Sequence, residues 1–164
     1  MISTSDELLD LLVSYGIAAK TYSHAPVHTV AESKDLRGEI AGLHTKNLFL
    51  RDKKRNFYLI VTEENTKIDL LSLGPKVDAN GKLSFASPDA LNEILGVSPG
   101  AVSLLAAVND VEKRVAIVID EALLKSNQIN CHPLTNTRTT SLSKSDIATF
   151  LSATGHDPRY ISMS

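Results

Sequence analysis

One ten-residue stretch near the end of the chain, CHPLTNTRTT at residues 131–140, concentrates polar side chains. His132 precedes a proline, which holds it in extended backbone, and its imidazole can act as a donor, an acceptor or a general base. A lone histidine is more often structural. Asn136 and Thr137 can bond a substrate, or they can build the loop through Asx and Thr turns. The stretch is typical of the wall of a binding site.

Two other positions carry groups that could act on an ester or a phosphate. Lys46 begins the apolar strand pattern KNLFL, an unusual place for a charge. Its ammonium can hold a phosphate or polarise a carbonyl, although a lysine that snorkels from a sheet edge is the more common case. In the loop SPGA, Gly100 and Ala101 can offer consecutive backbone N–H groups to an oxyanion, although an ordinary turn is more frequent.

The residue pattern argues against metal and nucleotide cofactors. None of the five histidines has HExxH spacing or a Cys/His partner motif, so we expect no dedicated metal site. Neither GxxxxGK[ST] nor GxGxxG occurs, so we expect no cofactor. Cys131 is the only cysteine, and we expect a small core or pocket residue there, not a nucleophile.

A cluster of positive charge lies in one predicted turn. The net charge of the chain is −2, so nucleic acid would have to meet a local basic patch. The turn RDKKRN supplies such a patch, or it is only a solvated turn. Its basic residues are Arg51, Lys53, Lys54 and Arg55.

Length and composition indicate one globular domain over residues 1–164, with 43% hydrophobic and 22% charged residues. No apolar run approaches the roughly 20 residues of a membrane span. The N-terminus lacks the pattern of a signal peptide. We therefore expect a cytoplasmic protein that makes no contact with membranes.

Caps, apolar spacing and β-rich runs predict the elements that must position these groups. Helices are expected at residues 3–16, 29–36, 67–73, 87–95, 120–124 and 143–154. Strands are expected at 20–24, 46–50, 57–62, 83–86, 115–119, 128–132 and 139–142, with 46–50 and 57–62 forming a hairpin. Residues 97–108 fit a strand or a buried segment equally. Without a regular βαβ rhythm, the order indicates an α/β (α+β) domain whose central mixed, largely antiparallel sheet is surrounded by helices.

Three segments, taken in order, resemble one family. They are KNLFLRD at 46–52, PGAVSLLAAVND at 99–110 and CHPLTNTRTTSLS at 131–143. They are similar to the YbaK-like aminoacyl-tRNA deacylases, in particular the freestanding prolyl-tRNA editing proteins. The resemblance implies a single YbaK-like editing domain that hydrolyses alanine wrongly esterified to proline tRNA. Its partner would be mischarged tRNA, with prolyl-tRNA synthetase as a further candidate partner. A synthetase pocket sized for proline cannot strongly exclude a smaller amino acid, so a second site must remove it.

The resemblance also implies roles for particular residues. Lys46 corresponds to a strand lysine that contacts the tRNA 3′ end or the substrate carbonyl. Gly100 and Ala101 correspond to a glycine loop that faces the ester, and His132 corresponds to the histidine of an HP motif. Oriented water and oxyanion stabilisation suffice for an activated ester, so neither a metal nor an acyl-enzyme is expected. The residues expected to shape the amino-acid pocket are Ser103, Leu104, Asn136 and Thr137, and those expected to contact tRNA are Arg51, Lys53, Lys54 and Arg55.

Two departures from many relatives leave specificity open. Leu104 and Leu105 stand where Pro-Phe is common, which could reshape the pocket. Arg138 stands where a small residue is common and could contact a phosphate or point to solvent. One alternative is therefore a deacylase of the same fold acting on tRNA mischarged with cysteine or serine. Another is a non-catalytic RNA-binding or adaptor domain, although scarce aromatic residues argue against a general single-strand binder.

Overall fold

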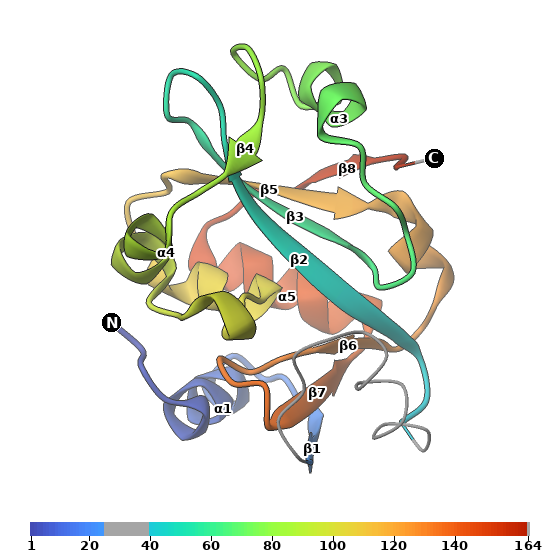
Figure 1. Cartoon of the computed structure of the whole chain (residues 1–164). Coiled ribbons are helices and arrows are strands. Elements are labelled where there is room, and N and C mark those ends of the chain that lie inside the picture. Colours follow the sequence, from blue (N-terminus) through green and yellow to red (C-terminus); the bar gives the residue numbers. More distant parts are fainter. Residues whose placement is uncertain (25–39, 164) are drawn as a thin grey trace.

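The protein is described by a computed structural model covering residues 1–24 and 40–163, and the helix expected at 29–36 lies outside these residues. In this part of the chain one sheet of eight strands runs through the molecule in the order β1-β7-β6-β2-β3-β5-β8, with β4 also paired to β2 (Figure 1). The strands are β1 Lys20–Ser23, β2 Leu43–Arg51, β3 Phe57–Glu63, β4 Ser84–Phe85, β5 Val115–Asp120, β6 Ile129–Cys131, β7 Arg138–Leu142 and β8 Arg159–Ile161.

The sheet is mixed, as the sequence predicts. The pairs β1–β7, β6–β7, β2–β3 and β2–β4 are antiparallel, whereas β2–β6, β3–β5 and β5–β8 are parallel. Antiparallel pairs are thus the majority, and the predicted hairpin of β2 and β3 is confirmed.

Side-chain caps set where the helices begin. Thr4, Asp69, Ser87 and Ser143 each accept a hydrogen bond from a backbone N–H in the first turn of the helix that follows. The α-helices are α1 Ser5–Ser14, α3 Leu70–Lys76, α4 Pro88–Leu95 and α5 Lys144–Thr154. Residues 1–24 and 40–163 also contain three 3₁₀ helices, η1 Pro99–Ala101, η2 Leu104–Asn109 and η3 Glu121–Lys125.

Alternation along the central strands creates two apolar clusters on opposite faces of the sheet. Phe49, Leu59 and Ile117 belong to the larger cluster, which α1, α4, η2 and α5 cover. Leu50 and Ile60 belong to the smaller cluster, which packs under α3. The candidate loops therefore connect elements that are anchored in one large core.

The structure corrects several predicted elements. The helix expected at 67–73 begins at Leu70, because Asp69 supplies the cap. Residues 97–108 form η1 and η2 and contain no strand, and the helix expected at 120–124 is the 3₁₀ helix η3. The strand β8 is not predicted, since it has three residues and two of them are exposed. No helix in the described residues is long and apolar enough to cross a bilayer.

Candidate active site

The candidate residues lie where β2 changes its partner. The first two residues of β2 pair with β6, whereas residues from Thr45 onward pair with β3. Thr45 Oγ1 donates a hydrogen bond to the backbone carbonyl of Asn130 at 2.8 Å, and β6 ends one residue later, at Cys131. The parallel pairing of β2 with β6 ends at His44 and Asn130, two residues before Lys46 in one segment and two residues before His132 in the other. A parallel pairing thus brings the two segments that carry the predicted residues side by side.

The loop after β6 fixes the orientation of His132. Its Nδ1 lies 2.9 Å from the backbone carbonyl oxygen of Arg138. A carbonyl oxygen only accepts hydrogen bonds, so Nδ1 carries the proton, and in the neutral ring Nε2 is the nitrogen with the lone pair. A half-buried imidazole in this tautomer is suited to receive a proton through Nε2.

A second histidine lies beside His132. His24 follows β1, and its ring centroid is 6.3 Å from that of His132, with the rings inclined by 63°. Its Nε2 is 2.8 Å from Thr139 Oγ1, and its backbone N–H donates to the Thr137 carbonyl at 2.8 Å. The sequence offers no sign of this neighbour, because it depends on the pairing of β1 with β7.

The glycine loop lies against the loop after β6, but one of its expected N–H groups is already used. A Cβ added at Gly100 would lie 3.9 Å from Asn136 Nδ2, so the two loops are in contact. The Ala101 N–H donates to the Ser98 carbonyl at 2.9 Å and closes the 3₁₀ turn. The expectation of two consecutive unused N–H groups is therefore wrong for Ala101 in this conformation.

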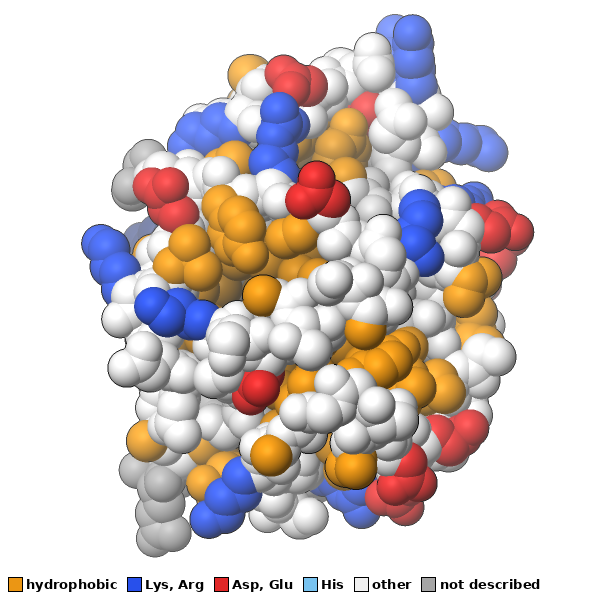
Figure 2. All heavy atoms as spheres, turned by 180° about the vertical axis from the view of Figure 1, so that it is seen from behind, with side chains coloured by type: hydrophobic (Ala, Val, Ile, Leu, Met, Phe, Trp, Pro, Cys, Tyr) orange, Lys and Arg blue, Asp and Glu red, His pale blue; other side chains and the backbone are white. Residues whose placement is uncertain are grey.

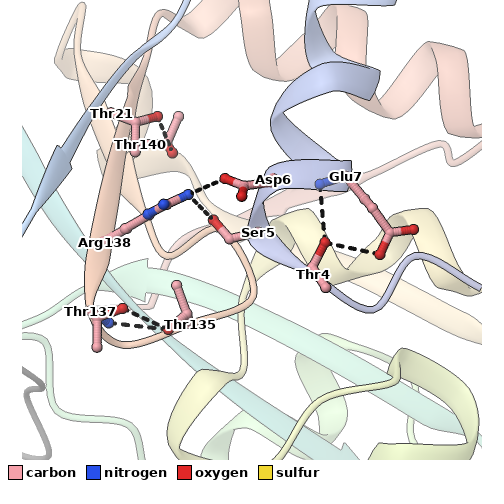
Figure 3. A network of polar contacts seen from close by, with 9 residues as sticks. All are labelled: Thr4, Ser5, Asp6, Glu7, Thr21, Thr135, Thr137, Arg138 and Thr140. Carbon is pink, nitrogen blue, oxygen red and sulfur yellow. Dashed lines mark hydrogen bonds and ion pairs between the residues drawn. The ribbon is translucent and has the colours of Figure 1, made fainter.

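Threonine and arginine side chains brace the loop between β6 and β7 (Figure 3). The Thr137 N–H donates to Thr135 Oγ1 at 3.3 Å, and the two hydroxyl oxygens lie 3.0 Å apart. Arg138 Nη1 donates to Asp6 Oδ1 at 2.7 Å and to Ser5 Oγ at 3.2 Å, both at the start of α1. Arg138 thus ties this loop to α1.

Two predicted pocket residues belong to the core. Ser103 and Leu104 are both 0% exposed. The Ser103 hydroxyl accepts the Leu105 N–H at 3.1 Å and caps η2, while Leu104 packs in the larger cluster. In this conformation neither side chain reaches solvent, so the geometry gives them a packing role and does not support direct contact with substrate.

Cys131 is unsuited to nucleophilic attack. Its thiol is buried, 2% exposed, and burial raises its pKa to about 12, although a hydrogen bond from Thr45 partly opposes the shift. The expectation of a core residue is confirmed. Among residues 1–24 and 40–163, no group of three or more His, Cys, Asp or Glu side chains is placed to hold a metal ion.

The predicted basic cluster lies at the far end of β2. Arg51 follows Lys46 by five residues, which is about 17 Å along a strand. A groove of about 750 Å³ opens beside the hairpin tip. Arg51, Arg55 and Arg114 line it together with Phe85, whose side chain is 63% exposed. Asp89 and Glu93 of α4 are also part of the lining.

One face of the molecule carries charges of both signs. On the face seen in Figure 2, basic and acidic side chains are interspersed around apolar areas. That face presents no continuous basic surface among the residues drawn in colour.

Comparisons with known proteins agree on one family. The model of the aminoacyl-tRNA editing domain matches residues 24–150. The prolyl-tRNA editing protein ProX of Acetoanaerobium sticklandii is 39% identical over 134 residues, 81% of each chain. The prolyl-tRNA synthetase associated domain-containing protein 1 of Mus musculus is 35% identical over 156 residues, 93% of this chain and 92% of that one.

Solved structures share the fold. A crystal structure of a protein proposed to be a trans-editing enzyme for prolyl tRNA synthetase aligns with a TM-score of 0.75 at 19% identity, covering 100% of this chain and 99% of that one. The family resemblance drawn from the three sequence motifs is confirmed. The chain belongs to the aminoacyl-tRNA editing domain family.

Proposed function

We propose that this protein is a trans-editing deacylase that hydrolyses the ester of alanine wrongly attached to proline tRNA. The observation that carries the proposal is the orientation of His132, whose Nδ1–H donates to the Arg138 carbonyl, in a member of the aminoacyl-tRNA editing domain family. Similarity to a protein named as a prolyl-tRNA editing protein supports the prolyl branch.

In the proposed reaction, His132 Nε2 accepts a proton from the attacking water, directly or through the ribose 2′-hydroxyl, as the water oxygen bonds to the acyl carbon. The ester C–O bond then breaks, and the proton passes to the leaving ribose oxygen, which releases alanine and uncharged tRNA. Lys46 binds the 3′-terminal nucleotide or polarises the ester carbonyl, because an ammonium stabilises negative charge that develops there. Gly100 and Asn136 line the acyl side, where the absence of a Cβ leaves room for a small amino acid. Position and electrostatics supply the catalysis, without a covalent nucleophile.

The tip of the β2–β3 hairpin, residues 51–56, binds the rest of the tRNA. The tip and the groove beside it combine guanidinium groups with the exposed ring of Phe85, which suits phosphates and unstacked bases. At about 17 Å from Lys46, this surface lies within reach of a tRNA whose 3′ end enters the site. The proposed place of action is the cytoplasm, with prolyl-tRNA synthetase as the source of the mischarged tRNA.

The role of Lys46 is tested with Lys46→Ala and, as a matched control, Lys67→Ala at an exposed position in the segment before α3. The first variant should lower kcat/KM for alanyl-tRNA(Pro) by about a hundredfold, as removal of one electrostatic group from a transition state does. The control should act like the wild type. Unchanged deacylation by a folded Lys46→Ala protein would remove this lysine from the mechanism.

The basic tip is tested by changing Arg51, Lys53, Lys54 and Arg55 to glutamine together. For each phosphate that the variant no longer binds, the slope of log Kd against log salt should fall by about 0.7–0.9. A Lys67→Gln, Lys125→Gln variant, which neutralises exposed lysines of other segments, is the control. An unchanged salt slope would mean that the tip is only a solvated turn.

A further inference from the structure

One buried carboxylate organises the hairpin tip. Asp52, 2% exposed, accepts five hydrogen bonds. Its Oδ1 accepts the backbone N–H groups of Lys54 at 3.0 Å and Asn56 at 2.9 Å. Its Oδ2 accepts Asn56 Nδ2 at 3.0 Å, the Tyr58 hydroxyl at 3.1 Å and the Asn80 N–H at 2.9 Å. The donors come from both sides of the turn and from a second segment.

The second segment is clamped to the tip. Asn80 is 28 residues from Asp52 in the chain, and its carbonyl in turn accepts the Lys53 N–H at 2.9 Å. Gly81 allows the close approach, since it has a φ of +78° and an added Cβ would lie 3.2 Å from Lys53 Cβ. The backbone of Asn80 therefore holds the hairpin tip through two hydrogen bonds, one donated to the Asp52 carboxylate and one accepted from the Lys53 N–H.

The carboxylate stays ionised in this place. Burial alone would raise the pKa of Asp52, but hydrogen bonds from the Asn56 side chain, the Asn80 N–H and the Asn56 N–H hold the pKa well below its ordinary value. Burial and the bond to Asp52 raise the pKa of Tyr58 to about 12, so its hydroxyl remains a donor. The cluster is thus locked over the whole physiological pH range.

The cluster also holds a basic residue in an unfavourable backbone conformation. Arg55 has a φ of 62°, which is uncommon for a residue other than glycine, and its N–H donates to the Asp52 carbonyl at 3.1 Å. Residues 53–55 are exposed and carry three positive charges around the buried carboxylate. Loss of the Asp52 carboxylate would leave the backbone N–H groups of Lys54, Asn56 and Asn80 without this acceptor.

We propose that Asp52 is a positioning residue for RNA binding, which holds the basic tip of the hairpin in the shape that meets tRNA phosphates. The proposal rests on the proposed function in that the partner is tRNA. A tip ordered before binding loses less conformational freedom when it binds, so preorganisation raises affinity without any contact from Asp52 itself. Loss of Asp52 should weaken tRNA binding and leave the ester chemistry intact.

The test uses Asp52→Asn, which keeps the shape but not the charge, with Asp69→Asn as the control. Asp69 is an exposed carboxylate that caps α3 through the Leu71 N–H at 3.2 Å. Two substrates are compared: alanyl-tRNA(Pro) and 3′-O-alanyl-adenosine, which lacks the rest of the tRNA. Binding of uncharged tRNA(Pro) is measured beside them.

Asp52→Asn should raise KM for the charged tRNA and Kd for the uncharged tRNA by about tenfold, while kcat and hydrolysis of the adenosine ester stay within about twofold. Tyr58→Phe, which removes one of the five donors, should give a smaller rise in both constants. Asp69→Asn should change neither substrate. An unchanged Kd, or an equal loss for both substrates, would overturn the proposal. If the wild type binds tRNA(Pro) but hydrolyses neither ester, the proposed function fails, and the Kd comparison still decides the role of Asp52.

Discussion

Asp110 belongs to a buried polar cluster that joins η2, β5 and the end of α5. The side chains of Asp110 and His156 are 1% and 3% exposed. Asp110 accepts the backbone N–H groups of Arg114 at 2.8 Å and Val115 at 3.0 Å, and His156 Nε2 at 3.0 Å. His156 Nδ1 lies 2.9 Å from Thr154 Oγ1. Substitution of Asp110 should therefore leave several buried donors without a partner.

The expected loss follows from these hydrogen bonds. A buried donor left without its acceptor costs about 1–3 kcal/mol, so the loss of the three bonds to Asp110 costs about 3–5 kcal/mol in all. Asp110→Ala should lower the free energy of unfolding by about this amount, a large share of the roughly 5–15 kcal/mol that stabilises a typical domain. Asp110→Asn retains one oxygen acceptor and should lose less, about 2 kcal/mol.

Urea unfolding followed by circular dichroism measures these losses, with Asp157→Ala at an exposed neighbouring position as the control. The pH dependence gives a second test. Burial alone would raise the pKa of Asp110, but hydrogen bonds from His156 and from the Arg114 and Val115 N–H groups hold it below its ordinary value. The charged form therefore contributes stability above the unfolded pKa of about 3.9, and this contribution disappears as the pH falls through the lower folded pKa.

The difference between wild type and Asp110→Asn should accordingly be constant near neutral pH and shrink below about pH 4. A loss under about 1 kcal/mol for Asp110→Ala would refute the reasoning. A difference that stays constant down to the pH of acid unfolding would refute the assignment of the charge.

Substitution of two glycines and labelling of one thiol give three further tests. Gly42→Ala should destabilise the protein by about 3 kcal/mol, because its φ is +102° and the new Cβ would lie 2.6 Å from the Gln128 carbonyl oxygen. Gly100→Ala should change thermal stability little, because its Cβ would meet Asn136 at an ordinary 3.9 Å, but it should slow deacylation. Equal melting temperatures for the Gly42→Ala and Gly100→Ala proteins, or full activity of Gly100→Ala, would contradict these predictions. Cys131 should resist iodoacetamide in the native protein and react in urea, since its thiol is buried with a pKa of about 12, and native labelling at the unfolded rate would disprove its burial.

Local signals explain which elements the sequence predicts well. The helices at 87–95 and 143–154 are confirmed because Ser87 and Ser143 supply their caps next to apolar spacing. The hairpin is confirmed because two β-rich runs flank a polar turn. β8 is not predicted, because its three residues show no periodic pattern and because its position depends on the pairing with β5.

The arrangement of the candidate site depends on pairings that no local pattern encodes. β2, which holds Lys46, and β6, which precedes His132, lie side by side because they pair between segments 86 residues apart. The link between His24 and Thr139 spans 115 residues. In the sequence, Asp52 is one more charged residue in a charged turn. Its role is seen only in the structure, from its burial and the approach of Asn80. Residue types thus suggest the chemistry, and long-range pairing decides which groups meet.

The central claim is tested most directly by incubating the purified protein with alanyl-tRNA(Pro), prolyl-tRNA(Pro) and alanyl-tRNA(Ala) in parallel. The account predicts that alanine is released from proline tRNA, while proline on the same tRNA and alanine on its own tRNA are retained. Retention of all three esters, or release of alanine from both tRNAs at the same rate, would contradict it.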